Sequence, residues 1–290
     1  MDRPGPIGLR ETFTRPGVAP WHPANVPSPG QSTLRRLVAL LTLGAAASGF
    51  GQSLLYFTDG DFLKLQAVDV TTGQLAFTVT TSSLAYPIVV RDTIALGHRD
   101  SAGLTGRYDL ATGALIGTLQ SALGTPNWSQ TVDGAAAGSF NYTFAAFTSS
   151  TIVYRTDADW ANPTVAFTLT GSDLVGITFD VVTGNLWVSD SSSVRQFTTT
   201  GTLVSQFSHP TGRAALAYQA STDTLWLVPN NSGSPLLQYS KSGTLLQSLA
   251  VPGRSGNVFG AEFRAIPEPS TWVLLALGAG LVAWRRRRRR

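Results

Sequence analysis

Apolar and polar residues alternate with a period of two through most of residues 52–266, in short runs separated by turns that carry Gly, Asn or Asp. This pattern is typical of antiparallel hairpins, because successive side chains of a strand point to opposite faces of a sheet. Enrichment in Thr, Val, Phe and Tyr favours strands as well. No stretch of this region has a convincing 3.6-residue period, so the pattern predicts an all-β body.

A turn followed by a short apolar strand recurs five times in this body. The copies are TTGQLAFTV (71–79), ATGALIGTL (111–119), ANPTVAFTL (161–169), TTGTLVSQF (199–207) and KSGTLLQSL (241–249). Successive copies are 40, 50, 38 and 42 residues apart, which is the length of a four-stranded propeller blade. Within the last two units, Trp187 and Trp226 occupy equivalent places on the second strand.

The two ends of the body complement each other. FGAEFRAI (259–266) has the pattern of an inner strand with no partner after it, and the first unit lacks an inner strand. Pairing of these ends would remove an exposed sheet edge. The sequence therefore predicts a β-propeller of about five four-stranded blades, closed by its N- and C-terminal strands, which resembles the broad group of YVTN- and NHL-like propellers. A β-sandwich or a β-helix is the alternative.

The positive charge of the chain lies at its ends. The formal net charge is +4, but residues 37–284 hold ten Lys and Arg against fifteen Asp and Glu, a formal charge of −5. An acidic body repels a phosphate backbone, so we expect no nucleic-acid partner. The chain contains no cysteine, which excludes disulfides, thiolate catalysis and cysteine-ligated zinc.

Residues 35–51 have the pattern of a secretory signal peptide. Arg35 and Arg36 precede eleven mostly apolar residues, Leu37 to Ala47, and small residues follow. Ala45 and Ala47 fit the rule for cleavage by signal peptidase after Ala47; a buried core helix is the alternative. Residues 1–34 contain seven prolines, so we expect a disordered extension, and its place before a signal suggests that translation starts downstream of Met1.

Residues 267–290 combine a short apolar run with a terminal block of arginines. The thirteen uncharged residues from Trp272 to Trp284 would rise only about 20 Å as a helix, against a hydrocarbon core of roughly 30 Å. We nevertheless predict a transmembrane helix over 270–284, for three reasons. The helix can be extended to Ser270, tryptophans stand at both ends where the membrane interfaces would lie, and the arginine side chains can reach back to the interface. The positive-inside rule keeps the arginines cytoplasmic and the body outside; they are Arg285, Arg286, Arg287, Arg288, Arg289 and Arg290. A buried C-terminal helix followed by solvated charges is the alternative.

The order of these tail elements closely resembles the PEP-CTERM protein-sorting signal. Pro267, Glu268 and Pro269 precede the apolar run, and the arginines end the chain. The resemblance implies processing near Pro-Glu-Pro by a membrane-embedded exosortase, after an inner-membrane intermediate. It also implies a Gram-negative bacterium, commonly one with exopolysaccharide and biofilm systems, and delivery to the cell surface or extracellular matrix.

Known catalytic signatures are missing from the sequence. It contains no HExxH, no paired His at metal spacing, no G-x-S-x-G and no Walker-type loop. The repeat register instead places polar residues after the second strand of each unit, and they are the candidate ligand residues: Asp59, Asp61, His98, Asp100, Ser149, Ser150, Asp190, Asn230 and Asn231. In a propeller such loops share one face around the channel mouth, where their oxygens would coordinate Ca²⁺ or bind sugar hydroxyls. The alternative is that tight turns simply need these residue types.

We therefore expect an exported, exosortase-sorted propeller that serves as a binding or scaffold module, with a link to polysaccharide or biofilm and no resident cofactor. Trp128 and Trp160 are candidates for stacking on sugars, although aromatic residues more often serve as packing. Two other functions stay open. One is an exported lactonase-like or glycan-active propeller enzyme with a metal such as Ca²⁺ at the channel mouth. The other is a binding protein that stays anchored because its tail is never cut.

Overall fold

The computed structural model describes residues 53–59, 63–81, 85–98, 104–120, 131–146, 150–170, 174–254 and 256–265. All of them belong to one compact unit, Ala46–Arg290. The predicted disordered extension, signal peptide, Pro-Glu-Pro motif, transmembrane helix and arginine tail lie outside the described residues.

The described residues form twenty strands in five antiparallel sheets of four, which we call blades A to E. Each blade is given from its inner to its outer strand. Blade A is β20 (Val258–Phe263), β1 (Leu54–Asp59), β2 (Lys64–Asp69) and β3 (Gln74–Thr80). Blade B is β4 (Ala85–Val90), β5 (Ile94–His98), β6 (Leu104–Tyr108) and β7 (Leu115–Gln120). Blade C is β8 (Thr131–Ala137), β9 (Phe140–Ala146), β10 (Ser150–Asp157) and β11 (Thr164–Thr170). Blade D is β12 (Gly176–Asp180), β13 (Asn185–Ser189), β14 (Ser193–Phe197) and β15 (Leu203–Ser208). Blade E is β16 (Ala214–Gln219), β17 (Thr224–Pro229), β18 (Leu236–Tyr239) and β19 (Leu245–Leu249).

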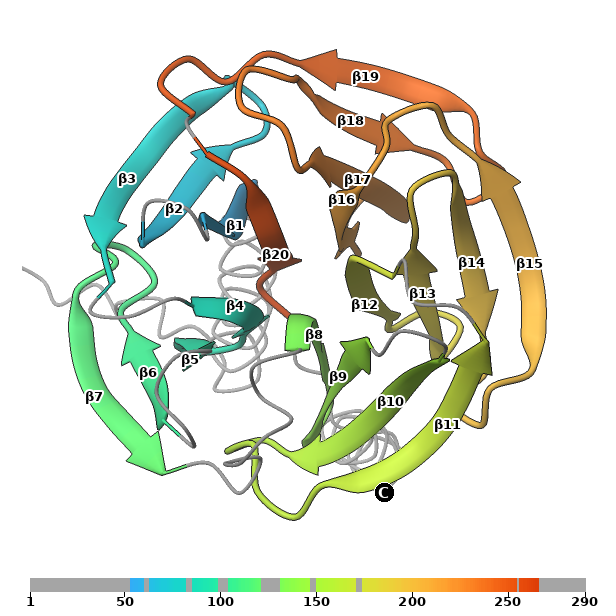
Figure 1. The fold of residues 1–290 in the computed structure, drawn as a ribbon. Helices are drawn as coiled ribbons and strands as arrows, with labels where there is room; N and C mark the ends of the chain where they lie inside the picture. The colour runs from blue at the N-terminus through green and yellow to red at the C-terminus, as the bar shows by residue number, and fades with distance from the viewer. Residues whose placement is uncertain are drawn as a thin grey trace, which may run out of the picture. The chain divides into compact units, whose positions relative to one another are not determined.

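The five blades surround a common axis, with β20, β4, β8, β12 and β16 innermost (Figure 1). The five repeated segments found in the sequence are the outer strands β3, β7, β11, β15 and β19. The predicted five-bladed propeller is therefore confirmed, and the sandwich and β-helix alternatives are wrong.

Blade A joins the two ends of the body, as predicted. β20 pairs antiparallel with β1, with Leu55 opposite Phe263 and Phe57 opposite Ala261. The strand is shorter than the predicted segment 259–266, since Arg264 and Ala265 follow it as irregular chain. Because β20 is the innermost strand of the blade, closure of the ring depends on the last residues before the sorting motif.

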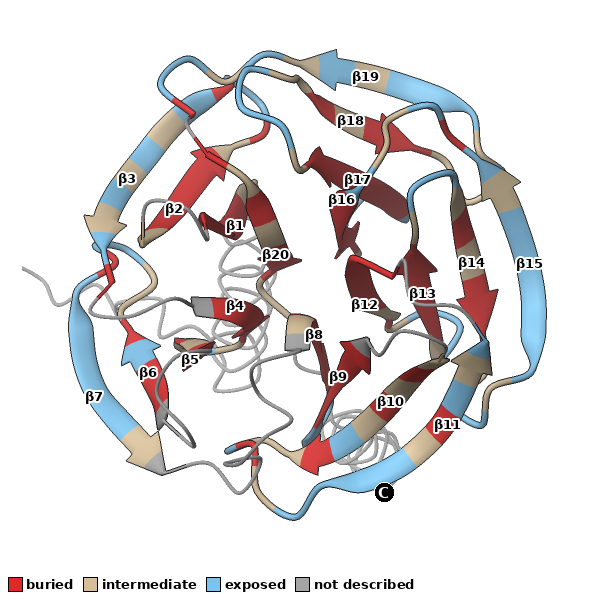
Figure 2. Cartoon of the chain, viewed as in Figure 1, coloured by how far each residue is buried: buried red, intermediate tan, exposed pale blue. Residues whose placement is uncertain are grey.

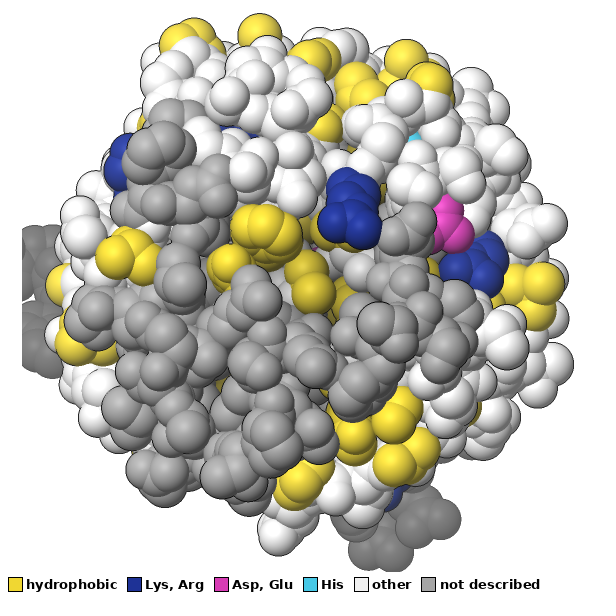
Figure 3. All heavy atoms as spheres, viewed as in Figure 1, with side chains coloured by type: hydrophobic (Ala, Val, Ile, Leu, Met, Phe, Trp, Pro, Cys, Tyr) yellow, Lys and Arg dark blue, Asp and Glu magenta, His cyan; other side chains and the backbone are white. Residues whose placement is uncertain are grey.

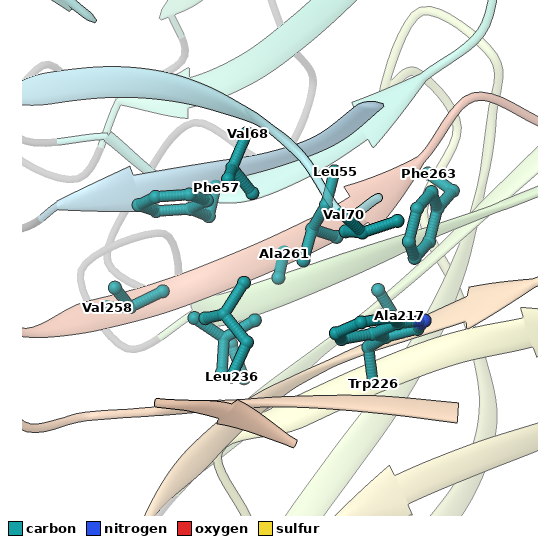
Figure 4. Packing of buried hydrophobic residues seen from close by; sticks show 12 residues of the cluster. Leu55, Phe57, Val68, Val70, Ala217, Trp226, Leu236, Val258, Ala261 and Phe263 are labelled. Atoms are coloured by element: carbon teal, nitrogen blue, oxygen red, sulfur yellow. The ribbon is translucent and has the colours of Figure 1, made fainter. Parts of the chain in front are cut away.

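The core lies between neighbouring blades. Figure 2 shows buried inner strands and largely exposed outer strands. Between blades E and A, the indole of Trp226 packs beside Phe263, with ring centroids 6.4 Å apart, and Leu55, Val258 and Leu236 fill the same layer (Figure 4).

The two equivalent tryptophans make equivalent hydrogen bonds. Trp187 Nε1 donates to Asp180 Oδ2 at 3.3 Å, and Trp226 Nε1 donates to Gln219 Oε1 at 2.9 Å. In both blades the acceptor is the last residue of the inner strand. A buried indole N–H needs such a partner, so the polar residues that end β12 and β16 have a packing role.

The glycine that recurs in the turn before the outer strand of blades A, B, D and E has a steric cause. Gly201 and Gly243 have φ of +90° and +87°, in the left-handed region that favours glycine. A Cβ on Gly201 would lie 2.7 Å from Phe167 Cβ, and one on Gly243 would lie 2.6 Å from Phe207 Cβ. These phenylalanines belong to the outer strand of the preceding blade, so the turn glycine allows adjacent blades to pack closely.

Candidate ligand face and channel

The five polar segments found in the sequence are equivalent in the fold. Each connects the second strand of its blade to the third, so all five lie at the same end of their blades, on what we call the ligand face. Asp59 and His98 are the last residues of β1 and β5, and Ser150 is the first of β10, so these three belong to strand ends instead of loops. Asp61, Asp100, Ser149 and the side chain of His98 lie outside the described residues.

Asp59 points into the protein. Its side chain is buried at the end of β1 against Gly256, where a Cβ would overlap the carboxylate. Arg254, four residues before β20, is also buried and its charge interacts with that of Asp59. Burial lowers the pKa of Arg254 to about 10, although Asp59 acts in the opposite sense.

The Arg254 guanidinium connects the closing segment to blade E. It donates to the carbonyl oxygens of Pro229, Asn231 and Ser234, which surround the β17–β18 loop. Asn231 thus contributes its backbone to ring closure and keeps an exposed side chain. Asn230 N donates to the Arg213 carbonyl at 2.8 Å, which holds the loop against the segment before β16.

Asp190 is held by its own turn. Its Oδ1 accepts from the backbone N–H groups of Ser192 and Ser193 at 2.8 and 2.7 Å, and its Oδ2 lies 3.1 Å from Arg195 Nη2. Burial alone would raise the pKa of Asp190, but hydrogen bonds from Ser193 and Ser192 and the charge of Arg195 outweigh it and lower the pKa. This is the turn chemistry that we gave as the alternative reading of the loop acids.

The described part of the ligand face is therefore rich in hydroxyl and amide groups and poor in available carboxylates. Its exposed polar side chains include Ser191, Ser192, Asn231 and Ser232. In Figure 3, the described atoms near the centre of this view are apolar groups with Lys or Arg side chains beside them. Such a surface suits neutral hydrogen-bonding ligands better than strongly charged ones.

The centre of the ring holds two buried carboxylates that the sequence reasoning missed. Asp133 on β8 is fully buried and accepts four backbone N–H groups from four blades. Its Oδ1 accepts from Gly134 at 2.7 Å and Ala261 at 3.2 Å, and its Oδ2 accepts from Ile177 at 3.1 Å and Leu216 at 3.4 Å. Asp133 thus ties the inner strands of blades C, A, D and E to one side chain.

Glu262 on β20 is the second carboxylate, with 5% of its surface exposed. Thr178 Oγ1 donates to it at 3.3 Å and accepts from the Tyr218 N–H at 3.0 Å. Burial raises the pKa of Glu262 well above its usual value, and the nearby charge of Asp133 acts in the same sense. Burial also raises the pKa of Asp133, against the lowering effect of its four backbone donors.

Small residues bring the inner strands close around these carboxylates. A Cβ on Gly176 would lie 2.5 Å from the Leu216 nitrogen of the next blade, and one on Gly260 would overlap the Tyr86 carbonyl oxygen. The sequence does contain a signal for these carboxylates. In VDGAAA (132–137) and FGAEF (259–263), a single acid stands among small residues, and this pattern would have indicated an acid near the axis of the ring.

The remaining candidates divide between packing and the undescribed segments. Trp160 is fully buried against Val89 and Ala136, which makes it a packing residue, and Trp128 lies outside the described residues. Within the described ranges, no group of three or more His, Cys, Asp or Glu is placed to hold a metal ion. The same ranges contain no helix long and apolar enough to cross a membrane.

Comparisons with known proteins identify the tail of the chain. Residues 265–290 match the family model of the PEP-CTERM protein-sorting motif. A search of curated protein sequences finds no match. Among solved structures, a chain of a nidogen/laminin complex matches with 12% identity and a TM-score of 0.49, over 73% of this chain and 98% of that one. A functionally unknown protein from Desulfotomaculum acetoxidans DSM 771 matches with 12% identity and a TM-score of 0.42, over 71% and 98% of the two chains. A protein of unknown function from Bacteroides caccae matches with 9% identity and a TM-score of 0.42, over 73% and 99%.

The sorting motif gives the destination of the protein. A PEP-CTERM tail marks an exported protein that an exosortase sorts through the membrane to the cell surface. The body that it delivers is the five-bladed propeller described above.

Proposed function

We propose that the exported propeller is a binding or scaffold module of the cell surface or extracellular matrix, and that it binds neutral polysaccharide through the ligand face. The observation that carries the proposal is the repetition of polar loops, with exposed hydroxyl and amide groups in blades D and E, on one face of a body that a sorting motif sends to the surface. Sugar hydroxyls are recognised by such donors and acceptors, and five equivalent loops offer several weak contacts to one polymer. The link to exopolysaccharide or biofilm is part of this proposal.

A polysaccharide-binding assay with paired variants tests the proposal. The full chain in mild detergent is passed over immobilised neutral and anionic bacterial exopolysaccharides. Ser191→Ala combined with Asn231→Ala removes exposed polar groups from two blades of the ligand face, and we expect binding to fall several-fold. Ser139→Ala, an equally exposed serine in the β8–β9 turn on the opposite face, is the matched control. Equal binding by all variants, or no binding to any polysaccharide, would contradict the proposal.

Calcium at the ligand face remains a separate proposal. The acids that would supply it are Asp59, Asp61, Asp100 and Asp190, of which the structure describes Asp59 and Asp190 and places both in other contacts. If Ca²⁺ binds through Asp61 and Asp100, thermal unfolding shifts to higher temperature with added Ca²⁺, and Asp61→Asn with Asp100→Asn removes the shift. An unfolding temperature that is independent of Ca²⁺ would exclude the site.

A further inference from the structure

The described chain ends on the face opposite the ligand face. β20 ends at Phe263, and the Ala265 N–H then donates to the Val90 carbonyl at 2.8 Å, at the end of β4. Arg264 pairs with Asp92 in the turn that follows, at 2.9 Å. This turn joins the first and second strands of blade B, and the corresponding turns of the other blades share its face, which we call the exit face.

The N-terminal end of the body lies at the same place. β1 begins at Leu54, and its neighbour Leu55 is opposite Phe263 in the register. The segment that leads back to the signal peptide therefore joins the propeller beside the segment that leads to the sorting motif. Both connections to the membrane start from the exit face.

The tether between the propeller and the predicted membrane helix is short. Only Ile266, Pro267, Glu268 and Pro269 separate Ala265 from the helix expected over 270–284. Four residues span at most about 14 Å when fully extended. The six residues of β20 run between the two faces and span roughly 20 Å. A tether shorter than the thickness of the propeller cannot pass around it to bring the ligand face to the membrane.

We propose that, while the tail is inserted, the exit face lies against the lipid surface and the ligand face points away from it. This inference rests on the predicted insertion of the tail into the membrane and adds the orientation in which the body is held. It leaves the ligand face open to polymer outside the membrane before the tail is cut.

The exit face carries side chains that tolerate a lipid interface. Val182 in the β12–β13 turn is 66% exposed, and Phe140 at the start of β9 is 39% exposed. The guanidinium of Arg155 lies 4.7 Å from the centroid of the Phe140 ring. Apolar groups beside an arginine with a long aliphatic stem suit the boundary between headgroups and acyl chains.

Single-cysteine labelling can test this orientation because the natural chain has no cysteine. Val182→Cys on the exit face and Ser191→Cys on the ligand face form a matched pair of exposed sites in blade D. Ser139→Cys and Ser232→Cys repeat the comparison in blades C and E. Each full-length variant carries a small fluorophore and is reconstituted into phosphatidylethanolamine and phosphatidylglycerol vesicles that contain a lipid with a nitroxide-labelled headgroup.

We expect strong quenching at positions 182 and 139 and little at positions 191 and 232. Equal quenching of the two faces, or stronger quenching of the ligand face, overturns the orientation. The vesicles contain no exosortase, so an exit face that stays unquenched would show that lipid is not its partner. Insertion of a twenty-residue Gly/Ser linker after Ala265 should reduce the difference between the faces, and an unchanged difference would refute the tether argument.

Carbonate extraction of the same vesicles separates this inference from the predicted membrane anchor on which it rests. If alkaline carbonate releases the chain, the tail does not anchor it, and the predicted anchor fails together with the orientation. If the chain resists extraction but both faces are quenched alike, the anchor stands and the orientation alone fails.

Discussion

Replacement of Asp133 by asparagine should weaken the whole ring, because this side chain is a shared acceptor for four blades. Asparagine has the same shape but only one oxygen, so two of the four backbone N–H groups would face an amide NH₂ in place of an acceptor. A buried donor left unsatisfied costs about 1–3 kcal/mol, so the two together cost roughly 2–6 kcal/mol. Removal of a buried carboxylate offsets part of this cost.

This loss is large beside the total stability of a domain, about 5–15 kcal/mol. Urea unfolding of the full chain in mild detergent, followed by the fluorescence of buried Trp187 and Trp226, measures it. Asp92→Asn is the matched control, because the Asp92 side chain is 89% exposed and we expect a change within about 0.5 kcal/mol. If Asp133→Asn is as stable as the control, the N–H groups have other acceptors and the role assigned to Asp133 is wrong.

Three further predictions concern the closing strand and the tail. Gly260→Ala should destabilise the propeller strongly, because the added Cβ would overlap the Tyr86 carbonyl oxygen. Gly117→Ala is the control and should be tolerated, because nothing lies within 4 Å of its added Cβ. The unfolding temperatures of the two variants test this difference. The raised pKa of Glu262 means that its contribution to stability is present below about pH 4.5 and is lost as the pH rises above that value. Glu262→Gln should therefore flatten the fall in stability above pH 4.5, and an unchanged pH profile from denaturant titrations would contradict the assignment. Processing should remove Arg285–Arg290, so the intact mass of the mature protein tests for sorting, and a retained tail would instead indicate permanent anchoring.

The sequence was sufficient to predict the architecture because the blade repeat is local. A turn, with Gly in four of the five copies, and the apolar strand after it mark every outer edge, and the spacing between copies sets four strands per blade. Closure of the ring could be predicted because each end of the body has a strand pattern that is incomplete on its own. A strand such as FGAEF needs a hydrogen-bonding partner that the neighbouring sequence does not offer. These signals depend on hydrogen-bonding pattern and side-chain periodicity, both of which a single sequence displays.

The ligand residues were harder to predict, because loop composition does not show where a side chain points. Asp59 and Asp190 occur at equivalent positions, yet the first is buried against Gly256 and the second caps its own turn. The same residue type serves packing, turn formation or binding, and the choice depends on neighbours from other blades. The prediction that this face binds a ligand therefore stays a proposal, although the equivalence of its loops follows from the topology.

The buried acids show the limit of local reasoning more clearly. Asp133 and Glu262 are 129 residues apart, and the repeat register places neither in a loop. They influence each other electrostatically because β8 and β20 are both inner strands and because glycines let the inner strands approach the axis. The Asp133 carboxylate completes the hydrogen bonding of four backbone N–H groups that point toward the axis of the ring. An acid in a run of small residues on an inner strand is thus better explained by closure of the ring than by catalysis. Replacing such an acid should therefore change the stability of the propeller and not an activity.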